Sequence, residues 1–250
     1  MALLDVDRVS VRFGGLIAVD EVSLEVEERR VTGLIGPNGA GKTTLFNVIC
    51  GLQSTRGGRV RLDGKDVTRL APHKRARRGI ARTFQRLEIF GSLSVRENVL
   101  VAAEIHHRWA RDDERPAAVA DEILDRLTLR DIGDALVDVL PIGLSRLVEV
   151  GRALATRPRV LLLDEPSSGL DPAETEWLGG ILGGLTADGL GVVLVEHDVG
   201  LVMQTCARIY ALEFGRIIAS GTPVEVRSNP AVQEAYLGTG IVHTVEVAEP

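Results

Sequence analysis

The sequence has few cysteines, few aromatic residues and no long hydrophobic run, and each of these absences excludes a class of protein. Its two cysteines, Cys50 and Cys206, provide neither a disulfide framework nor the spacing of a metal site. Aromatic residues make up 4% of the chain, too few to form platforms for single-stranded nucleic acid. No apolar run approaches the roughly 18 residues of a membrane helix, and early acidic residues argue against a signal peptide.

Basic residues are also fewer than acidic ones. The chain has 29 Lys and Arg against 35 Asp and Glu, so its formal net charge is −6 and it has no overall attraction for nucleic acid. Of its 250 residues, 45% are hydrophobic and 26% charged, a composition typical of a globular protein with a sizeable core. We therefore expect a cytoplasmic protein of about one domain that does not bind nucleic acid.

Two kinds of strand pattern are present. Apolar and polar residues alternate over three early segments, which predicts strands with one buried face, as in an antiparallel sheet: 9–13, 22–26 and 60–62. Four other segments are short and mostly apolar, which predicts strands covered on both faces, as in a parallel sheet: 31–35, 160–163, 192–195 and 209–212. The combination predicts an α/β fold with a parallel core sheet and an antiparallel β-subdomain.

A helical subdomain is expected to interrupt this fold. Residues from about 86 to 155 are mostly helical in pattern, as at Leu144, Leu147 and Val148, with a polar break at 108–116. We predict one domain over residues 1–240, with the helical subdomain inserted in it. Residues 241–250 lack clear periodicity and are expected to form a loose tail.

A phosphate-binding loop follows the strand predicted at 31–35. It matches G-x-x-x-x-G-K-[ST] at every fixed position and comprises Gly36, Pro37, Asn38, Gly39, Ala40, Gly41, Lys42, Thr43 and Thr44. Glycines let backbone N–H groups approach phosphate oxygens closely, and the helix that follows directs its N-terminus at the anion. Lys42 would contact the β- and γ-phosphates, and the Thr43 hydroxyl can bind Mg²⁺.

A nucleoside triphosphate site also needs carboxylates, and Asp164 and Glu165 supply them. They follow an apolar strand, at the carboxyl end where ligands of α/β sheets bind. Asp164 can hold Mg²⁺ through water, and Glu165 can orient the attacking water or accept its proton.

These motifs, with a later glutamine and a downstream histidine, occur in the order seen in ABC ATPases, and the chain resembles that family over nearly its whole length. Within the family, two motifs look like those of the ATPase subunits of branched-chain amino acid importers: residues 79–85 (GIARTFQ) and 196–198 (EHD). Residues 220–223 and 235–238 are similar to the ends of those subunits.

The resemblance assigns further residues to the nucleotide site. Phe13 takes the position of the aromatic ring under the adenine, although a strand residue that faces the core is the alternative. Gln85 matches the loop glutamine that reaches Mg²⁺ and the attacking water and that touches the membrane subunit. His197 would contact the γ-phosphate. Asp171 ends a segment, 168–171, that resembles the loop crossing a dimer interface.

The family signature, usually LSGGQ, aligns with residues 140–144 (LPIGL) and departs from it. Pro141 replaces the serine whose hydroxyl binds the γ-phosphate held by the opposite subunit, and it has neither a hydroxyl nor an N–H. Gly143 keeps its backbone donor, and Ser145 offers a hydroxyl nearby. One lost donor in a preorganised site costs about 3 kcal/mol of transition-state stabilisation. If this chain pairs with a different ATPase subunit, its signature segment would affect only the ATP of the partner, so we hypothesise that the two sites of such a dimer are unequal.

The resemblance implies a dimer of ATPase subunits, homomeric or heteromeric, with two ATP molecules and Mg²⁺ between them. Thr43, Gln85 and Asp164 would bind Mg²⁺, while Glu165, His197, Gln85 and Lys42 would catalyse hydrolysis. Membrane permease subunits and a solute-binding protein would complete an importer, with this chain peripheral on the cytoplasmic face of the inner membrane.

Three alternatives remain open at this stage. The chain could serve another solute or lipopolysaccharide export, although the run 81–85 argues against export. It could be a non-transport ABC ATPase of DNA repair or the ribosome, although it lacks long coiled coils and has a single ATPase half. It could also bind ATP with little turnover, as Pro141 suggests. The basic run 73–78 is interpreted as the solvated face of a short helix rather than a lipid or nucleic-acid site.

Overall fold

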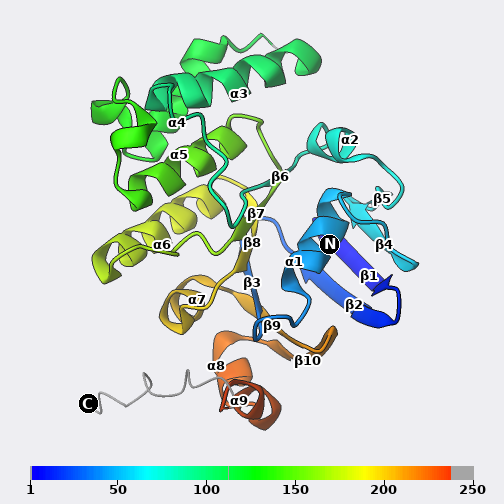
Figure 1. The fold of residues 1–250 in the computed structure, drawn as a ribbon. Helices are drawn as coiled ribbons and strands as arrows, with labels where there is room; N and C mark the ends of the chain where they lie inside the picture. The colour runs from blue at the N-terminus through cyan, green and yellow to red at the C-terminus, as the bar shows by residue number, and fades with distance from the viewer. Residues whose placement is uncertain (1, 112, 238–250) are drawn as a thin grey trace.

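The protein, in a computed structural model, is described over residues 2–111 and 113–237, and Figure 1 shows its arrangement. Its strands are β1 (Leu4–Phe13), β2 (Leu16–Val26), β3 (Val31–Ile35), β4 (Gly57–Leu62), β5 (Lys65–Asp66), β6 (Ile80–Arg82), β7 (Val160–Asp164), β8 (Gly191–Val195), β9 (Arg208–Glu213) and β10 (Arg216–Gly221). Its α-helices are α1 (Lys42–Cys50), α2 (Pro72–Ala76), α3 (Val95–Ala110), α4 (Pro116–Arg126), α5 (Ile142–Leu154), α6 (Pro172–Ala187), α7 (Val199–Thr205), α8 (Pro223–Arg227) and α9 (Pro230–Leu237). Two short 3₁₀ turns, Arg130–Ile132 and Val137–Val139, lie between α4 and α5.

The three alternating segments near the N-terminus form an antiparallel sheet, as predicted. Its strand order is β2-β1-β4-β5, and β1 pairs with both β2 and β4. Val6 of β1 lies opposite Leu24 of β2 and Val60 of β4, and all three side chains are buried. The apolar face of this sheet therefore belongs to the core, as its period of two requires.

The four apolar segments form the centre of a second sheet, with strand order β10-β9-β3-β8-β7-β6. Neighbours from β9 to β6 are parallel, and only β10 pairs antiparallel, with β9. The parallel core sheet is thus confirmed. The edge strands β6 and β10 were not predicted, because β6 has three residues and β10 is only partly buried.

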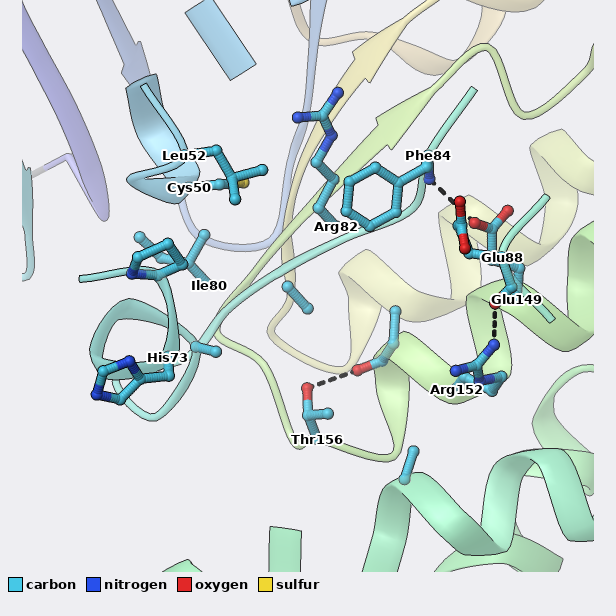
Figure 2. Close-up of a pocket in the computed structure, with 15 residues that line it drawn as sticks. Cys50, Leu52, His73, Ile80, Arg82, Phe84, Glu88, Glu149, Arg152 and Thr156 are labelled. Carbon is cyan, nitrogen blue, oxygen red and sulfur yellow. Dashed lines mark hydrogen bonds between the residues drawn. The ribbon is translucent and has the colours of Figure 1, made fainter. Parts of the chain in front are cut away.

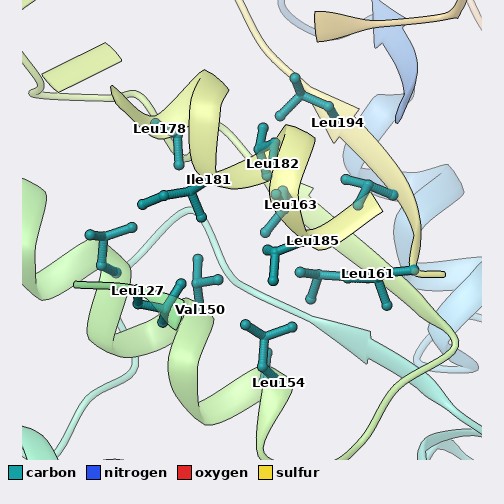
Figure 3. Packing of buried hydrophobic residues seen from close by; sticks show 14 of the residues in the cluster. Leu127, Val150, Leu154, Leu161, Leu163, Leu178, Ile181, Leu182, Leu185 and Leu194 are labelled. Carbon is teal, nitrogen blue, oxygen red and sulfur yellow. The ribbon is translucent and has the colours of Figure 1, made fainter. Parts of the chain in front are cut away.

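Burial on both faces explains why the central strands are apolar throughout. Leu161 and Leu163 of β7 point into one hydrophobic cluster, while Leu162 points into another. Figure 3 shows the first cluster, in which Leu161 and Leu163 meet side chains of α5 and α6. The second cluster contains Phe46 and Ile49 of α1, packed between strands of both sheets.

The helical insertion is also confirmed as a feature of the fold. Helices α3, α4 and α5 lie together beside the parallel sheet, between β6 and β7 in sequence (Figure 1). The predicted polar break is shorter than expected, because α3 continues to Ala110 and the helical pattern resumes at Pro116. The tail predicted at 241–250 lies outside the described residues. Over the described ranges, none of the helices combines the length and apolar character needed to cross a membrane.

The basic run forms the short helix α2, but its interpretation as a solvated face is wrong for one residue. Arg75 is buried, and its guanidinium donates to the carbonyl oxygens of Val48, Ile49, Thr68 and Leu70 at 2.6–3.0 Å. Arg75 therefore joins α2 to the end of α1, while the flanking basic side chains are exposed.

Candidate functional site

The carboxyl ends of four parallel strands meet at one edge of the core sheet. β3 leads into the phosphate loop, β6 leads to Gln85, β7 ends in Asp164, and β8 leads to His197. This edge is where ligands of α/β proteins bind, because loops from neighbouring strands converge there.

The phosphate loop has the backbone conformation that its glycines allow. Gly36, Gly39 and Gly41 have φ values of +153°, +80° and +110°, which side chains rarely permit. A β-carbon on Gly41 would lie 2.5 Å from the carbonyl oxygen of Ala18, so the loop also needs glycine there for space. The order strand, loop and helix agrees with the motif's requirement.

Lys42 opens α1 and is buried over the loop. Its ammonium group donates to the carbonyl oxygens of Gly36 at 2.6 Å and Pro37 at 3.0 Å. Burial lowers the pKa of Lys42, and the negative charges of Glu165 and Asp164 oppose that shift. The ammonium group of Lys42 and the carboxylates of Asp164 and Glu165 therefore lie close enough to interact electrostatically.

Asp164 has a partner that the sequence analysis missed. Its Oδ2 accepts a hydrogen bond from the Arg82 guanidinium at 2.7 Å, and both side chains are buried. Arg82 also donates to Asn47 Oδ1 at 2.5 Å and lies over the rings of Phe46 and Phe84. Arg82 ends β6, next to β7 in the sheet, and this adjacency is the signal that could have revealed the pair.

Glu165 lies between Gln85 and His197. Gln85 Nε2 donates to Glu165 Oε2 at 3.1 Å, and His197 Nε2 lies 2.8 Å from Glu165 Oε1. An ionised carboxylate only accepts hydrogen bonds, so the tautomer of His197 that can donate to it is the one with the proton on Nε2. Glu165 itself has φ of +51°, a conformation that concentrates at functional sites. The structure thus brings together three side chains that the sequence separates widely.

The oxygen donors predicted for a metal suit Mg²⁺, which prefers carboxylate, hydroxyl and amide oxygens. Thr43 is exposed in the first turn of α1, and Asp164 has Oδ1 in addition to the oxygen that Arg82 engages. No cluster of three His, Cys, Asp or Glu residues within the described ranges could hold a metal by itself. Phosphate oxygens would therefore have to complete the coordination.

The remaining predicted residues lie on other segments of the chain. Phe13 ends β1 with 48% of its surface exposed, so the alternative that it faces the core is wrong. Asp171 caps α6 by accepting the Glu174 N–H at 2.8 Å. Gly143 lies in the first turn of α5, where an added β-carbon would be 2.7 Å from Leu170 Cδ2. The signature segment and the segment 168–171 are therefore neighbours.

Pro141 precedes α5 as its N-cap residue, with φ of −53° and ψ of 152°. Proline suits this position, because the first N–H groups of a helix lack intrahelical partners. Ser145 is buried, which leaves little of its surface for a second subunit. The positive end of α5 therefore remains the main feature by which this segment attracts an anion.

Three charged residues of α5 hold the Gln85 loop. Arg146 donates to the carbonyl oxygens of Phe84 and Gln85 at 3.1 and 2.9 Å, and Glu149 accepts the Phe84 N–H at 3.0 Å. Arg152 donates to the Glu88 carbonyl oxygen. Burial raises the pKa of Glu149, which the Phe84 N–H and Arg146 oppose. Charged residues on an otherwise apolar helix face are the sequence signal for this contact.

A groove of about 410 Å³ borders the Gln85 loop. Figure 2 shows Arg82, Phe84, Glu149 and Arg152 along it, with His73 and Leu52 opposite. Arg82 thus lines the groove and also contacts the carboxylate of Asp164, while Phe84 lines the groove and donates its N–H to Glu149.

Tyr236 of α9 contacts the start of the phosphate loop. The backbone of Gly36 forms a hydrogen bond with its phenol, and burial raises the pKa of Tyr236 to about 12.

Comparisons with known proteins agree with this geometry. Residues 19–168 match the family described as ABC transporter, and residues 216–242 match the one described as branched-chain amino acid ATP-binding cassette transporter. The chain is 39% identical to the high-affinity branched-chain amino acid transport ATP-binding protein BraF of Pseudomonas aeruginosa, covering 94% of this chain and 98% of that protein. It is 37% identical to the lipopolysaccharide export system ATP-binding protein LptB of Haemophilus influenzae, covering 95% and 98%. The ADP conformation of MJ1267, an ATP-binding cassette of an ABC transporter, superimposes with a TM-score of 0.87 at 34% identity, covering 95% and 99%.

Proposed function

This chain belongs to the ABC transporter family as an ATPase subunit homologous to branched-chain amino acid transport ATP-binding proteins, and from that premise we propose how its residues hydrolyse ATP and what the hydrolysis drives. The observation that carries the proposal is the position of Glu165, held between Gln85 and His197 directly after Asp164. Residues 1–240 make up one ATPase domain, and the inserted helical subdomain spans about 86–155.

ATP binds with its phosphates on the loop from Gly36 to Thr44. The loop N–H groups, the positive end of α1 and Lys42 neutralise the phosphate charge. Phe13, exposed at the end of β1, stacks on the adenine. Thr43, Gln85 and Asp164 would hold Mg²⁺, which when bound would neutralise charge on the phosphate oxygens.

Glu165 acts as the general base. Each of its oxygens accepts one hydrogen bond and keeps a second acceptor position, so the attacking water can donate to the carboxylate before its proton moves there. His197 then directs its Nε2–H at the γ-phosphate instead of at Glu165. Gln85 orients the water, because its amide already lies within hydrogen-bond distance of Glu165.

A second ATPase subunit, a copy of this chain or a different one, completes each site. Gly143 and Asp171 face that subunit, supported by the neighbouring positions of their segments at the starts of α5 and α6. ATP then favours the closed dimer, and hydrolysis removes that preference.

The groove beside the Gln85 loop receives a permease subunit, with the chain peripheral on the cytoplasmic face of the inner membrane. The groove is supported as the contact because Arg82 and Phe84 line it and also contact Asp164 and Glu149. The substrate class is branched-chain or similar amino acids, delivered by a solute-binding protein, and the match of residues 216–242 supports import. Affinity purification of the tagged chain from native membranes should recover permeases of that type, whereas recovery of lipopolysaccharide-export permeases would favour export.

Replacing the base tests the catalytic part of the proposal. Glu165→Gln keeps the size of the side chain but cannot accept a proton, so kcat should fall by about 100-fold or more while ATP binding persists. ATP binding is measured by calorimetry and turnover by phosphate release. Glu104→Gln, on the exposed surface of α3, is the matched control. Undiminished turnover in Glu165→Gln would assign the base elsewhere.

A further inference from the structure

Glu196 lies directly after β8 and beside His197, but its side chain is turned into the protein. The residue is 3% exposed, whereas the His197 side chain is 33% exposed. The two neighbours therefore face opposite environments, as successive residues at the end of a strand do.

The carboxylate of Glu196 accepts hydrogen bonds from two different loops. Oε1 accepts the Ser167 N–H at 2.7 Å, and Oε2 accepts the His197 N–H at 3.1 Å. The Asp198 N–H and the Ser167 hydroxyl donate to it as well. Burial raises the pKa of Glu196, and these hydrogen bonds, all from neutral donors, oppose that shift.

Burying a carboxylate costs free energy unless hydrogen bonds replace its lost hydration, and the donors around Glu196 do so. A carboxylate has two oxygens with about four acceptor positions, all of them able to face N–H groups. An amide of the same size would have to direct its own N–H₂ at one of the two backbone donors. Only Glu at this position accepts from both loops at its present reach.

Both of these loops carry groups of the ATPase site. Glu165 precedes Ser167 by two residues, and its own N–H donates to the Val195 carbonyl oxygen at 2.9 Å. The His197 ring lies 2.8 Å from Glu165. Contacts therefore run in a closed circuit from Glu165 through Ser167 and Glu196 to His197 and back to Glu165.

We propose that Glu196 is a positioning residue of the ATPase site, whose buried carboxylate joins the segment after Glu165 to the segment that carries His197 and so sets the relative positions of these two side chains. This inference rests on the proposed roles of Glu165 and His197. It also places the start of the segment 168–171, which faces the second subunit, under the control of the same carboxylate.

Glu196→Gln tests this role by removing one of the two acceptors. The expected result is a kcat lowered about tenfold or more, because small displacements of reacting groups strongly reduce rates. The KM for ATP should stay within about threefold, because the phosphate loop keeps its contacts. Glu97→Gln is the control, since Glu97 also accepts a backbone N–H, from Ser94 at 2.8 Å, but in the helical insertion.

A double-mutant cycle with His197→Ala separates positioning from general stability. If Glu196 acts through His197, Glu196→Gln should lower the single-turnover rate by less than about twofold in the His197→Ala background. An equal loss in both backgrounds, or a loss that follows the thermal unfolding midpoint, would overturn the inference. If Glu196→Gln does not fold, Glu196→Asp serves in the same cycle, because it shortens the reach to Ser167 while keeping the charge.

The failure of this inference can be told from failure of the proposed function. Loss of turnover in Glu165→Gln combined with wild-type kcat in Glu196→Gln would overturn the positioning role alone. Unchanged turnover in Glu165→Gln would instead overturn the proposed function.

Discussion

The ion pair between Arg82 and Asp164 is buried on both sides, with 5% and 2% of the two side chains exposed. Arg82→Met keeps much of the aliphatic volume but leaves the Asp164 carboxylate without its nearest counter-charge. Breaking a buried pair in this way costs about 3–5 kcal/mol of unfolding free energy. The contacts of Arg82 with the rings of Phe46 and Phe84 add to the loss.

A surface pair of almost the same length provides the comparison. Arg96 and Asp121 are 2.8 Å apart, but 36% and 37% of their side chains are exposed. Arg96→Met should therefore cost no more than about 1 kcal/mol, because solvent screens the pair. Bond length is matched between the two pairs, so a larger loss in Arg82→Met reports the burial of its pair together with the contacts of Arg82 with Asn47, Phe46 and Phe84.

Urea unfolding followed by circular dichroism measures both changes. For a chain of this size, a loss of 3–5 kcal/mol also lowers the melting temperature by about 6–20 °C. Adding Asp164→Asn to Arg82→Met should recover at least half of the stability, because the uncompensated charge is then gone. A loss in Arg82→Met as small as in Arg96→Met would refute this account of the pair.

Three further perturbations follow from the structure. Burial raises the pKa of Glu149 above 4.5, so its stabilising contribution is complete below that pH and is lost as the pH rises through the raised pKa. The unfolding free energy of wild type relative to Glu149→Gln should fall from about pH 4 to neutral in urea titrations, and a constant difference would contradict this sign. Pro141→Ser restores a donor and should raise ATP hydrolysis by the isolated homodimer, by up to about 100-fold, whereas equal rates would remove the hypothesis of unequal sites. Gly41→Ala would place a β-carbon at a φ of +110° and against the Ala18 carbonyl oxygen, so its unfolding free energy in urea titrations should fall by roughly 2 kcal/mol or more. Gly39→Ala has open space and a φ of +80°, and should lose about 1 kcal/mol, so similar losses for the two glycines would contradict the role of the Ala18 contact.

Local chemistry explains how much of the site could be predicted. The phosphate loop is a contiguous segment whose glycines, lysine and threonine act at fixed spacing, so the sequence contains the whole motif. Asp164 and Glu165 follow a strand whose apolar character is visible without any structure. Gln85 and His197 were assigned by resemblance, and their contacts with Glu165 depend on the order of β6, β7 and β8 in the sheet.

Hydrophobic periodicity was enough to predict the parallel core, the antiparallel sheet and the helical insertion, because it is a local record of which face is buried. Which charged side chains face inward could not be predicted in this way, because it depends on contacts between distant segments. Arg75, Arg82 and Glu196 are each buried against groups distant in the chain or in a neighbouring loop. Charge in a sequence normally indicates exposure, and a buried charge becomes visible only when folding brings its hydrogen-bond partners to it.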